Sequence, residues 1–170
     1  MQPTPLWALG LFDDYYQALL HAFKFKDRLD CGEYLANRLA RMIASDARSK
    51  SIEAVIPVPL HPARKRERGF NQCELLALRA TTALNISAPT FGLKRHANTA
   101  SQTRLTRSDR QQNVAQAFTC PILPDPPGTV LLIDDVQTTG ATLAACASVL
   151  QDAGVAKVYG AVVAIAELTG

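Results

Sequence analysis

The stretch from Val130 to Thr142, VLLIDDVQTTGAT, limits what this chain can fold into more than any other feature. Its apolar start predicts a buried strand, and the strand ends abruptly at two adjacent carboxylates, Asp134 and Asp135. Small and hydroxylated residues follow and lead into a predicted helix over residues 141–152. A strand, a short turn and a helix in this order are typical of an open α/β sheet, in which ligands bind at the carboxyl ends of the strands.

Helices and strands alternate along the rest of the chain. Apolar spacing, caps and prolines predict helices over residues 13–25, 32–47, 71–84 and 109–117, strands over 53–59, 90–93 and 156–166, and a basic loop over 61–70. Asn71, with Glu74 three residues later, is expected to cap the helix over 71–84, and Gly154 is expected to end the helix that begins at residue 141. The predicted fold class is α/β, with a mainly parallel sheet flanked by helices. One domain over residues 1–170 is expected, with an N-terminal helical pair in 1–50 and an α/β core in 51–170.

Composition narrows the class of protein further. Apolar residues make up 48% of the chain and charged residues 19%, as in globular domains. No apolar run approaches the ~20 residues that span a bilayer. A signal peptide has basic residues before its apolar run, whereas none precede the first apolar run here. The four cysteines are too far apart for a zinc knuckle or a redox motif, which is typical of a reducing compartment. We expect a cytoplasmic protein without membrane insertion and without zinc.

Positive charge is concentrated in the middle of the chain. Ten of the eighteen Lys and Arg residues lie in residues 64–110, and only Lys157 follows them. This distribution indicates an anionic partner. Residues 95–110, RHANTASQTRLTRSDR, are polar and irregular, and a loop of that length within one domain is usually functional or mobile.

A sugar phosphate fits the stretch from Val130 to Thr142. Carboxylates accept hydrogen bonds from a ribose diol, so Asp134 and Asp135 are candidates for that role. Backbone N–H groups at a helix N-terminus bind phosphate, and small residues allow a close approach. This makes a cradle for a 5′-phosphate out of Thr138, Thr139, Gly140, Ala141 and Thr142. Two alternatives fit less well. A capped helix preceded by merely solvated acids would explain one Asp and one capping Thr, but not two acids followed by small residues. A nucleotide hydrolase would need a glycine-rich loop that ends in Lys and Ser or Thr, and the chain lacks one.

The same stretch closely resembles the phosphoribosyl-pyrophosphate (PRPP) motif of type I phosphoribosyltransferases, with Gln137 at a usually apolar position. IPVPLHPARKRERGFNQCELLA and RHANTASQTRLTRSDRQQNVAQAF resemble the competence protein F (ComF/GntX) family within that fold. The resemblance covers residues 12–166. It implies a PRPP-binding, Mg²⁺-dependent phosphoribosyltransferase of the glycosyltransferase class, connected with DNA uptake. Whether the chain is catalytically active, and on which acceptor, is left open.

The resemblance also implies roles for individual residues. Asp134 and Asp135 would bind the ribose hydroxyls and stabilise charge on the ribose, and Arg95 would act with them in catalysis. The strand that ends near Pro57 would be followed by a pyrophosphate loop consisting of Val58, Pro59, Leu60 and Arg68. The loop over residues 95–110 and its continuation would close over the site, with Thr99, Gln102, Arg110 and Asn113 as candidate contacts.

Other partners follow from the resemblance or from the residues. Members of this family commonly begin with a four-cysteine zinc module, whose cysteine pairs have no counterpart in this sequence, and Mg²⁺ is expected to arrive with PRPP. The alternative function is that of a non-catalytic protein that senses PRPP, or that binds single-stranded DNA or the DNA-uptake machinery. The loop over residues 95–110 has no aromatic residue for base stacking, which weakens the DNA-binding version. The apolar segment from Trp7 to Phe12 is expected either to cover the site or to join a second subunit in a homodimer.

Overall fold

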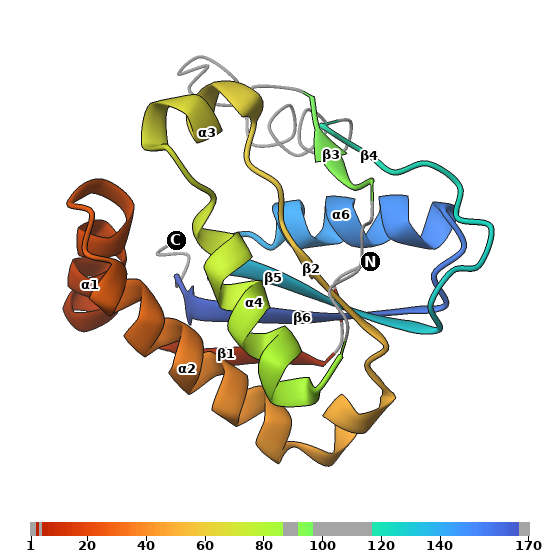
Figure 1. Cartoon of the computed structure of the whole chain (residues 1–170), viewed down its shortest axis with the longest axis horizontal. Helices are drawn as coiled ribbons and strands as arrows, with labels where there is room; N and C mark the ends of the chain where they lie inside the picture. The colour runs from red at the N-terminus through yellow and green to blue at the C-terminus, as the bar shows by residue number, and fades with distance from the viewer. Residues whose placement is uncertain (1–2, 4, 87–91, 97–116, 167–170) are drawn as a thin grey trace.

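The computed structural model describes residues 3, 5–86, 92–96 and 117–166. Four parallel strands form its central sheet in the order β1-β6-β5-β2 (Figure 1). Their bounds are Leu6–Leu11 for β1, Ala54–Pro57 for β2, Thr129–Gln137 for β5 and Lys157–Ile165 for β6. The predicted α/β fold of the type I phosphoribosyltransferase kind, with a parallel sheet flanked by helices, is confirmed.

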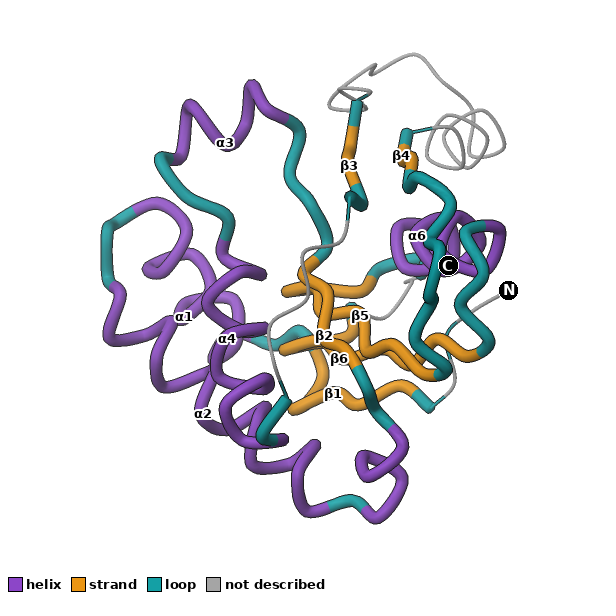
Figure 2. The backbone as a smooth tube through the Cα atoms, turned by 45° about the vertical axis from the view of Figure 1, so that its right-hand side comes forward, coloured by secondary structure: helices purple, strands orange, loops and turns teal. Residues whose placement is uncertain are grey.

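Helices cover both faces of this sheet, as Figure 2 shows. One face carries α1 (Asp14–Phe25), α2 (Leu29–Ser45) and α4 (Gln72–Leu84), and the other carries α6 (Ala141–Asp152). Successive side chains of β5 point to opposite faces. Leu131 and Ile133 therefore join the core under α2 and α4, whereas Val130 and Leu132 join the core under α6. A strand buried on both faces explains the unbroken apolar run before the acid pair.

The ends of the helices follow their sequence signals. Asp13 caps α1, because its Oδ1 accepts a hydrogen bond from the backbone N–H of Tyr16 at 3.0 Å. At the end of α6, Gly154 has a φ of 106° and donates its N–H to the carbonyl of Gln151, while the N–H of Val155 reaches that of Leu150. These two bonds form a Schellman motif, so the predicted stop at Gly154 is confirmed.

The segment from Trp7 to Phe12 does not cover the site. Residues 6–11 form the edge strand β1, which pairs in parallel with β6, with Leu6 opposite Gly160. Trp7 is 6% exposed, and its ring contacts that of Tyr159 edge-on at 5.7 Å between centroids. The N-terminal part is therefore a strand followed by a helical pair. Leu11, the last residue of β1, and Phe12 after it are exposed, and the contact with a second subunit stays a prediction.

The predicted basic loop over residues 61–70 is wrong for most of its length. Residues Pro62–Arg68 form a short helix, α3. Proline at the first helical position and glycine just past the end are helix signals that the charge run obscured. Nδ1 of His61 accepts from the N–H of Ala63 at 3.2 Å, and Gly69 ends the helix with a φ of 84°. The basic side chains therefore project from a regular helix rather than from a loop.

Smaller elements complete the described chain. A 3₁₀ turn, η1 (Ala47–Ser51), precedes β2, and β3 (Lys94–Arg95) pairs antiparallel with β4 (Phe118–Thr119). The predicted strand over residues 90–93 lies only partly within the described residues, and the predicted helix over 109–117 lies almost wholly outside them. Among the residues that the structure describes, every helix falls short of the length and apolarity that crossing a membrane requires.

Candidate functional site

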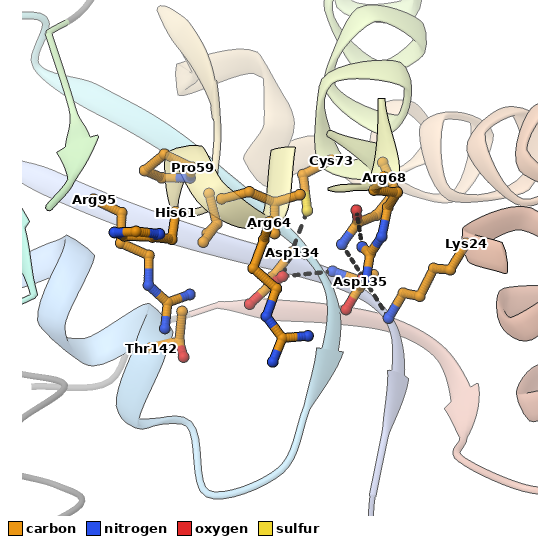
Figure 3. A pocket seen from close by; sticks show the side chains of 13 residues that line it. Lys24, Pro59, His61, Arg64, Arg68, Cys73, Arg95, Asp134, Asp135 and Thr142 are labelled. Atoms are coloured by element: carbon orange, nitrogen blue, oxygen red, sulfur yellow. Dashed lines mark hydrogen bonds and ion pairs between the residues drawn. The ribbon is translucent and has the colours of Figure 1, made fainter. Parts of the chain in front are cut away.

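The acid pair lies near the carboxyl end of β5 and borders a cavity of about 250 Å³. The prediction that the strand ends at the acids is wrong, because pairing with β6 continues as far as Gln137. Side chains from four segments of the chain converge on it: the end of α1, the segment from Val58 through α3 into α4, strand β3, and the β5–α6 unit (Figure 3). The lining residues are Lys24, Val58, Pro59, Leu60, His61, Arg64, Arg68, Gln72, Cys73, Arg95, Asp134, Asp135 and Thr142. Two carboxylates thus face four basic side chains across a single hollow, which we call the acid-pair pocket.

Asp135 is buried and already neutralised. Its Oδ2 lies 2.6 Å from Nζ of Lys24, and the same oxygen accepts a hydrogen bond from Nε2 of Gln72. Oε1 of Gln72 in turn accepts from Nη1 of Arg68 at 2.5 Å. A chain of polar contacts therefore joins α1, α3, α4 and β5 behind the cavity. Burying a carboxylate costs much free energy unless it is paired and hydrogen-bonded, and Asp135 is both.

Asp134 has a different environment although it is the next residue. It is partly exposed, and its Oδ1 accepts from the backbone N–H of Asp135 at 2.8 Å and from Sγ of Cys73 at 3.5 Å. Burial, followed by the negative charge of Asp135, raises the pKa of Asp134 from its ordinary value of 3.8 to about 7. Burial also raises the pKa of the Cys73 thiol well above its usual range, so this cysteine is a neutral donor here. Asp134 is the acid free to meet a ligand.

The raised pKa predicts a pH-dependent stability of the ligand-free protein. Between about pH 4 and 7, folded Asp134 holds a proton that the unfolded chain has lost, so the contribution of this group to stability falls as pH rises through that window. The charged and titratable groups around it are Asp135, Lys24, Cys73, Arg95 and Cys146. The melting temperature of Asp134→Asn, relative to that of the wild type, should therefore be higher at pH 8 than at pH 5, by about 3 °C or more. Thermal unfolding at both pH values measures this gain; an equal offset at both would contradict the pKa.

Lys24 reaches the acid pair because of close packing behind it. Phe23, the preceding residue, is fully buried, and its ring lies 5.4 Å from that of Phe70 between centroids. A Cβ at Gly32 on α2 would come within 2.4 Å of the Phe23 ring, so only glycine leaves room for it. The close approach of α1 to α2 therefore fixes the end of α1 over β5 and places the amine of Lys24 on Asp135.

The segment after β2 forms the wall opposite α6. Asn71 ties it down, since its Nδ2 donates to the carbonyl of Val58 at 3.0 Å while its Oδ1 accepts from the N–H of Cys73 at 3.1 Å. The predicted cap at Asn71 is confirmed, and the same side chain holds Val58, Pro59 and Leu60 beside the cavity. The predicted capping contact from Glu74 is replaced by an ion pair between Glu74 and Lys65 of α3 at 2.6 Å.

Basic residues line the cavity from two elements besides α1. Arg64 and Arg68 come from α3, and Arg95 comes from β3. The guanidinium of Arg95 lies over the ring of Phe118 at 5.3 Å, and burial lowers its pKa from the usual value without removing its charge. Together with Lys24, these residues place four cationic side chains around the acid-pair pocket, facing two carboxylates. One of the two, Asp134, has a raised pKa and therefore takes up a proton more readily than an ordinary carboxylate.

The turn after β5 is built as the small residues suggest. Gly140 has a φ of 76°, a left-handed conformation that favours glycine, and α6 starts directly after it. Thr138 and Thr139 are exposed, and Thr142 is the one residue of the predicted phosphate cradle among those that line the cavity. Oγ1 of Thr139 accepts from the N–H of Ala141 at 3.3 Å. Oε1 of Gln137 is buried and has no hydrogen-bond partner among the described residues. This agrees with the resemblance, in which the position is usually apolar.

The structure brings together eight of the twelve predicted site residues that it describes, Thr142 among them. Asp134, Asp135, Arg95, Arg68 and the segment Val58–Leu60 all line one cavity. The candidate contacts Thr99, Gln102, Arg110 and Asn113 lie outside the described residues. Sequence reasoning missed Lys24, Arg64, Gln72 and Cys73. For Lys24 a signal existed, since it lies four residues after Leu20 and next to Phe23, on the buried face of α1, where a charge needs a partner.

No protein-family model matches the chain. Competence protein F of Haemophilus influenzae is 33% identical over 168 residues, covering 93% of this chain and 73% of that protein. DNA utilization protein YhgH of Salmonella typhi is 31% identical over 163 residues, and its counterpart in Escherichia coli K12 is 30% identical, each match covering 92% of this chain and 71% of the relative. At this identity and coverage the chain belongs to the competence protein F family.

Proposed function

We propose that this protein binds PRPP with Mg²⁺ in the acid-pair pocket and transfers its phosphoribosyl group to a nitrogen acceptor. The observation that carries this proposal is the meeting of Asp134 and Asp135 with the basic side chains of Lys24, Arg64, Arg68 and Arg95 around one hollow. A ligand that fits must offer both hydroxyl donors and several negative charges. PRPP offers a ribose diol, a phosphate and a pyrophosphate.

Each part of the pocket suits one part of that ligand. Asp134 is partly exposed and accepts ribose hydroxyls, while Asp135 holds Lys24 and Gln72 in place beside it. The turn before α6 and the first N–H groups of that helix suit the 5′-phosphate. Arginine from α3 and β3 suits the pyrophosphate, because its planar fork binds phosphate oxygens in pairs.

The proposed reaction is a substitution at the anomeric carbon. The bond from this carbon to the pyrophosphate oxygen breaks, and the electron pair leaves with the pyrophosphate. The lone pair of the acceptor nitrogen forms the new bond, and the proton of that nitrogen passes to water or to the departing pyrophosphate. Positive charge that develops on the ribose lies beside Asp134 and Asp135, and negative charge on the pyrophosphate lies beside Arg68 and Arg95.

The donor set fits a Mg²⁺ ion that is carried mainly by the ligand. Sγ of Cys73 and carboxylate oxygens of Asp134 and Asp135 lie within 4.8 Å of one another. A protonated thiol is a poor ligand for Mg²⁺, and Lys24 already occupies Oδ2 of Asp135. This leaves Asp134 to face the ion, which neutralises phosphate charge when it is bound.

The names of the relatives support a role in DNA utilisation for this chain as well. They include Competence protein F and DNA utilization protein. We place the activity in a reducing, cytoplasmic compartment, because all four cysteines are unpaired.

Direct binding of single-stranded DNA is the second candidate, and one observation favours it. Tyr15 and Tyr34, which are 49% and 42% exposed, share a hydrogen bond of 2.9 Å on the outer surface of α1 and α2. The guanidinium of Arg38 lies 5.6 Å from the centroid of the Tyr34 ring. Exposed aromatic rings beside arginine are typical of surfaces on which bases stack.

Calorimetry decides between the two candidates. PRPP should bind the wild-type protein in the presence of Mg²⁺, more tightly than ribose 5-phosphate or pyrophosphate alone, and EDTA should weaken it. A labelled single-stranded oligonucleotide is titrated in parallel over a series of salt concentrations. Absence of heat with PRPP, together with oligonucleotide binding that falls steeply with salt, would reject the enzyme and support the DNA-binding candidate.

A further inference from the structure

A second hollow adjoins the acid-pair pocket. It encloses about 310 Å³ between the end of α1 and α3, and we call it the α1–α3 pocket. Its lining residues are Lys24, Phe25, Asp27, Arg64, Glu67 and Arg68. Lys24, Arg64 and Arg68 line both hollows and so form a common wall between them. In Figure 3, Lys24 and Arg68 lie on the same side of the acid pair. A molecule in the α1–α3 pocket would therefore lie next to a ligand held by the acid pair.

Regular structure presents these side chains toward one space. Arg64, Glu67 and Arg68 are spaced by three and four residues along α3, which places them on one face of that helix. Asp27 lies just after α1 with a φ of 52°, where the chain turns toward α2. Phe25 is the last residue of α1 and is 63% exposed, so packing in the core does not explain why an aromatic residue stands at this position.

Phe25 and Arg68 form a platform. The guanidinium of Arg68 lies 5.1 Å from the centroid of the Phe25 ring, and a hydrogen bond to Gln72 fixes that guanidinium. A stacked guanidinium and an exposed aromatic ring together offer a planar surface to a planar ligand. Arg68 belongs both to the platform and to the common wall, so a ring stacked on the platform would lie beside the acid-pair pocket.

The charges of the α1–α3 pocket narrow the class of ligand. Arg64, Asp27 and Glu67 make no ion pair among the described residues, so each can meet a ligand. An apolar ligand is disfavoured, because it would displace water from Arg64, Asp27 and Glu67 without offering them a polar partner. The two carboxylates disfavour a polyanion such as nucleic acid. A ring that carries one acidic group for Arg64 and N–H donors for Glu67 or Asp27 satisfies all of them.

We propose that the α1–α3 pocket is the acceptor subsite, and that it takes a planar nitrogen heterocycle bearing a single acidic group. This assignment of the acceptor rests on the proposed phosphoribosyl transfer, whereas the binding of such a ring to Phe25 and Arg64 does not. The two claims can therefore fail separately.

The test uses two matched pairs of probes with the full chain: orotate with uracil, and nicotinate with nicotinamide. Within each pair the ring is alike and one member carries the acidic group. Calorimetric titration should show at least one acid binding about 10-fold more tightly than its neutral partner. Phe25→Ala should weaken that acid about 10-fold through lost stacking. Leu29→Ala is the control for Phe25, since Leu29 is exposed and does not line the pocket.

Charge is tested on α3 in the same way. Arg64→Gln should remove the preference for the acid over its neutral partner, while Arg66→Gln, which changes the same charge at an exposed position outside the lining, should leave it intact. Melting temperatures confirm that the variants are folded. The proposal is overturned when neither acid binds better than its neutral partner, or when Phe25→Ala leaves the affinity unchanged. If an acid binds in a Phe25-dependent way but PRPP does not bind, the α1–α3 pocket is confirmed as a binding site and the transfer reaction is rejected. If PRPP still binds to Phe25→Ala, the PRPP site and the α1–α3 pocket are separate sites.

Discussion

Replacing Asp134 and Asp135 together by asparagine is expected to lower the affinity for PRPP with Mg²⁺ by about 100-fold or more. Asparagine keeps the size of the side chain but removes the two negative charges, and a hydrogen bond to a charged group contributes about 1.5–3 kcal/mol. Asp134 is expected to accept from two ribose hydroxyls, and the loss of two such bonds corresponds to at least about 100-fold in the dissociation constant. The titration is made at pH 8, because Asp134 has a pKa of about 7 and is ionised there.

The control for this variant is Asp125→Asn, which makes the same chemical change at an exposed position outside the acid-pair pocket. It should bind PRPP as the wild type does. The two single variants divide the effect: Asp134→Asn should account for most of it, since Asp134 is the acid that is open to the ligand. Unchanged affinity in the double variant would show that the carboxylates serve the fold and that the ligand, if any, is held by the basic side chains.

Lys24→Met is expected to lower the free energy of unfolding by roughly 3 kcal/mol. The amine of Lys24 lies 2.6 Å from Asp135, and the two side chains are only 18% and 9% exposed. Methionine fills similar space but leaves a carboxylate without its cation, at a position where water reaches it poorly. For a chain of this size the loss corresponds to a decrease of roughly 10 °C in melting temperature.

A double-mutant cycle identifies the source of this loss. Lys24→Met combined with Asp135→Asn should be more stable than Lys24→Met alone, because no buried charge is then left unpaired. Lys26→Met removes an exposed lysine two residues further on and should change stability little. Urea unfolding gives the four free energies. Equal effects of Lys24→Met and Lys26→Met, or an additive cycle, would mean that the ion pair contributes nothing to the fold.

Local patterns were enough to predict the strand, turn and helix that carry Asp134. The apolar run of β5, the small residues up to Gly140 and the stop at Gly154 each act through neighbours in sequence, and each is confirmed. Asn71 was also within reach of such reasoning, because a cap acts over two or three residues.

The residues that the sequence did not reveal depend on packing between distant elements. Gln72 reaches Asp135 across two elements, and Lys24 reaches it only because Phe23 fits against Gly32. No spacing along the chain records such a contact. Strand β1 was overlooked for a similar reason: its six residues become a strand by pairing with β6, whereas their sequence alone fits any short apolar segment.

The pairing of β1 with β6 also has a consequence for how the protein folds. Leu6 lies opposite Gly160, so β1 finds its partner only after a further 154 residues have been synthesised. Pairings between such distant residues slow folding, because a long loop must close before any contact compensates for the lost entropy. Until then an apolar strand stays uncovered on the ribosome. The newly made chain should therefore be most prone to aggregation just before β6 emerges, and a chaperone would help it most at that moment.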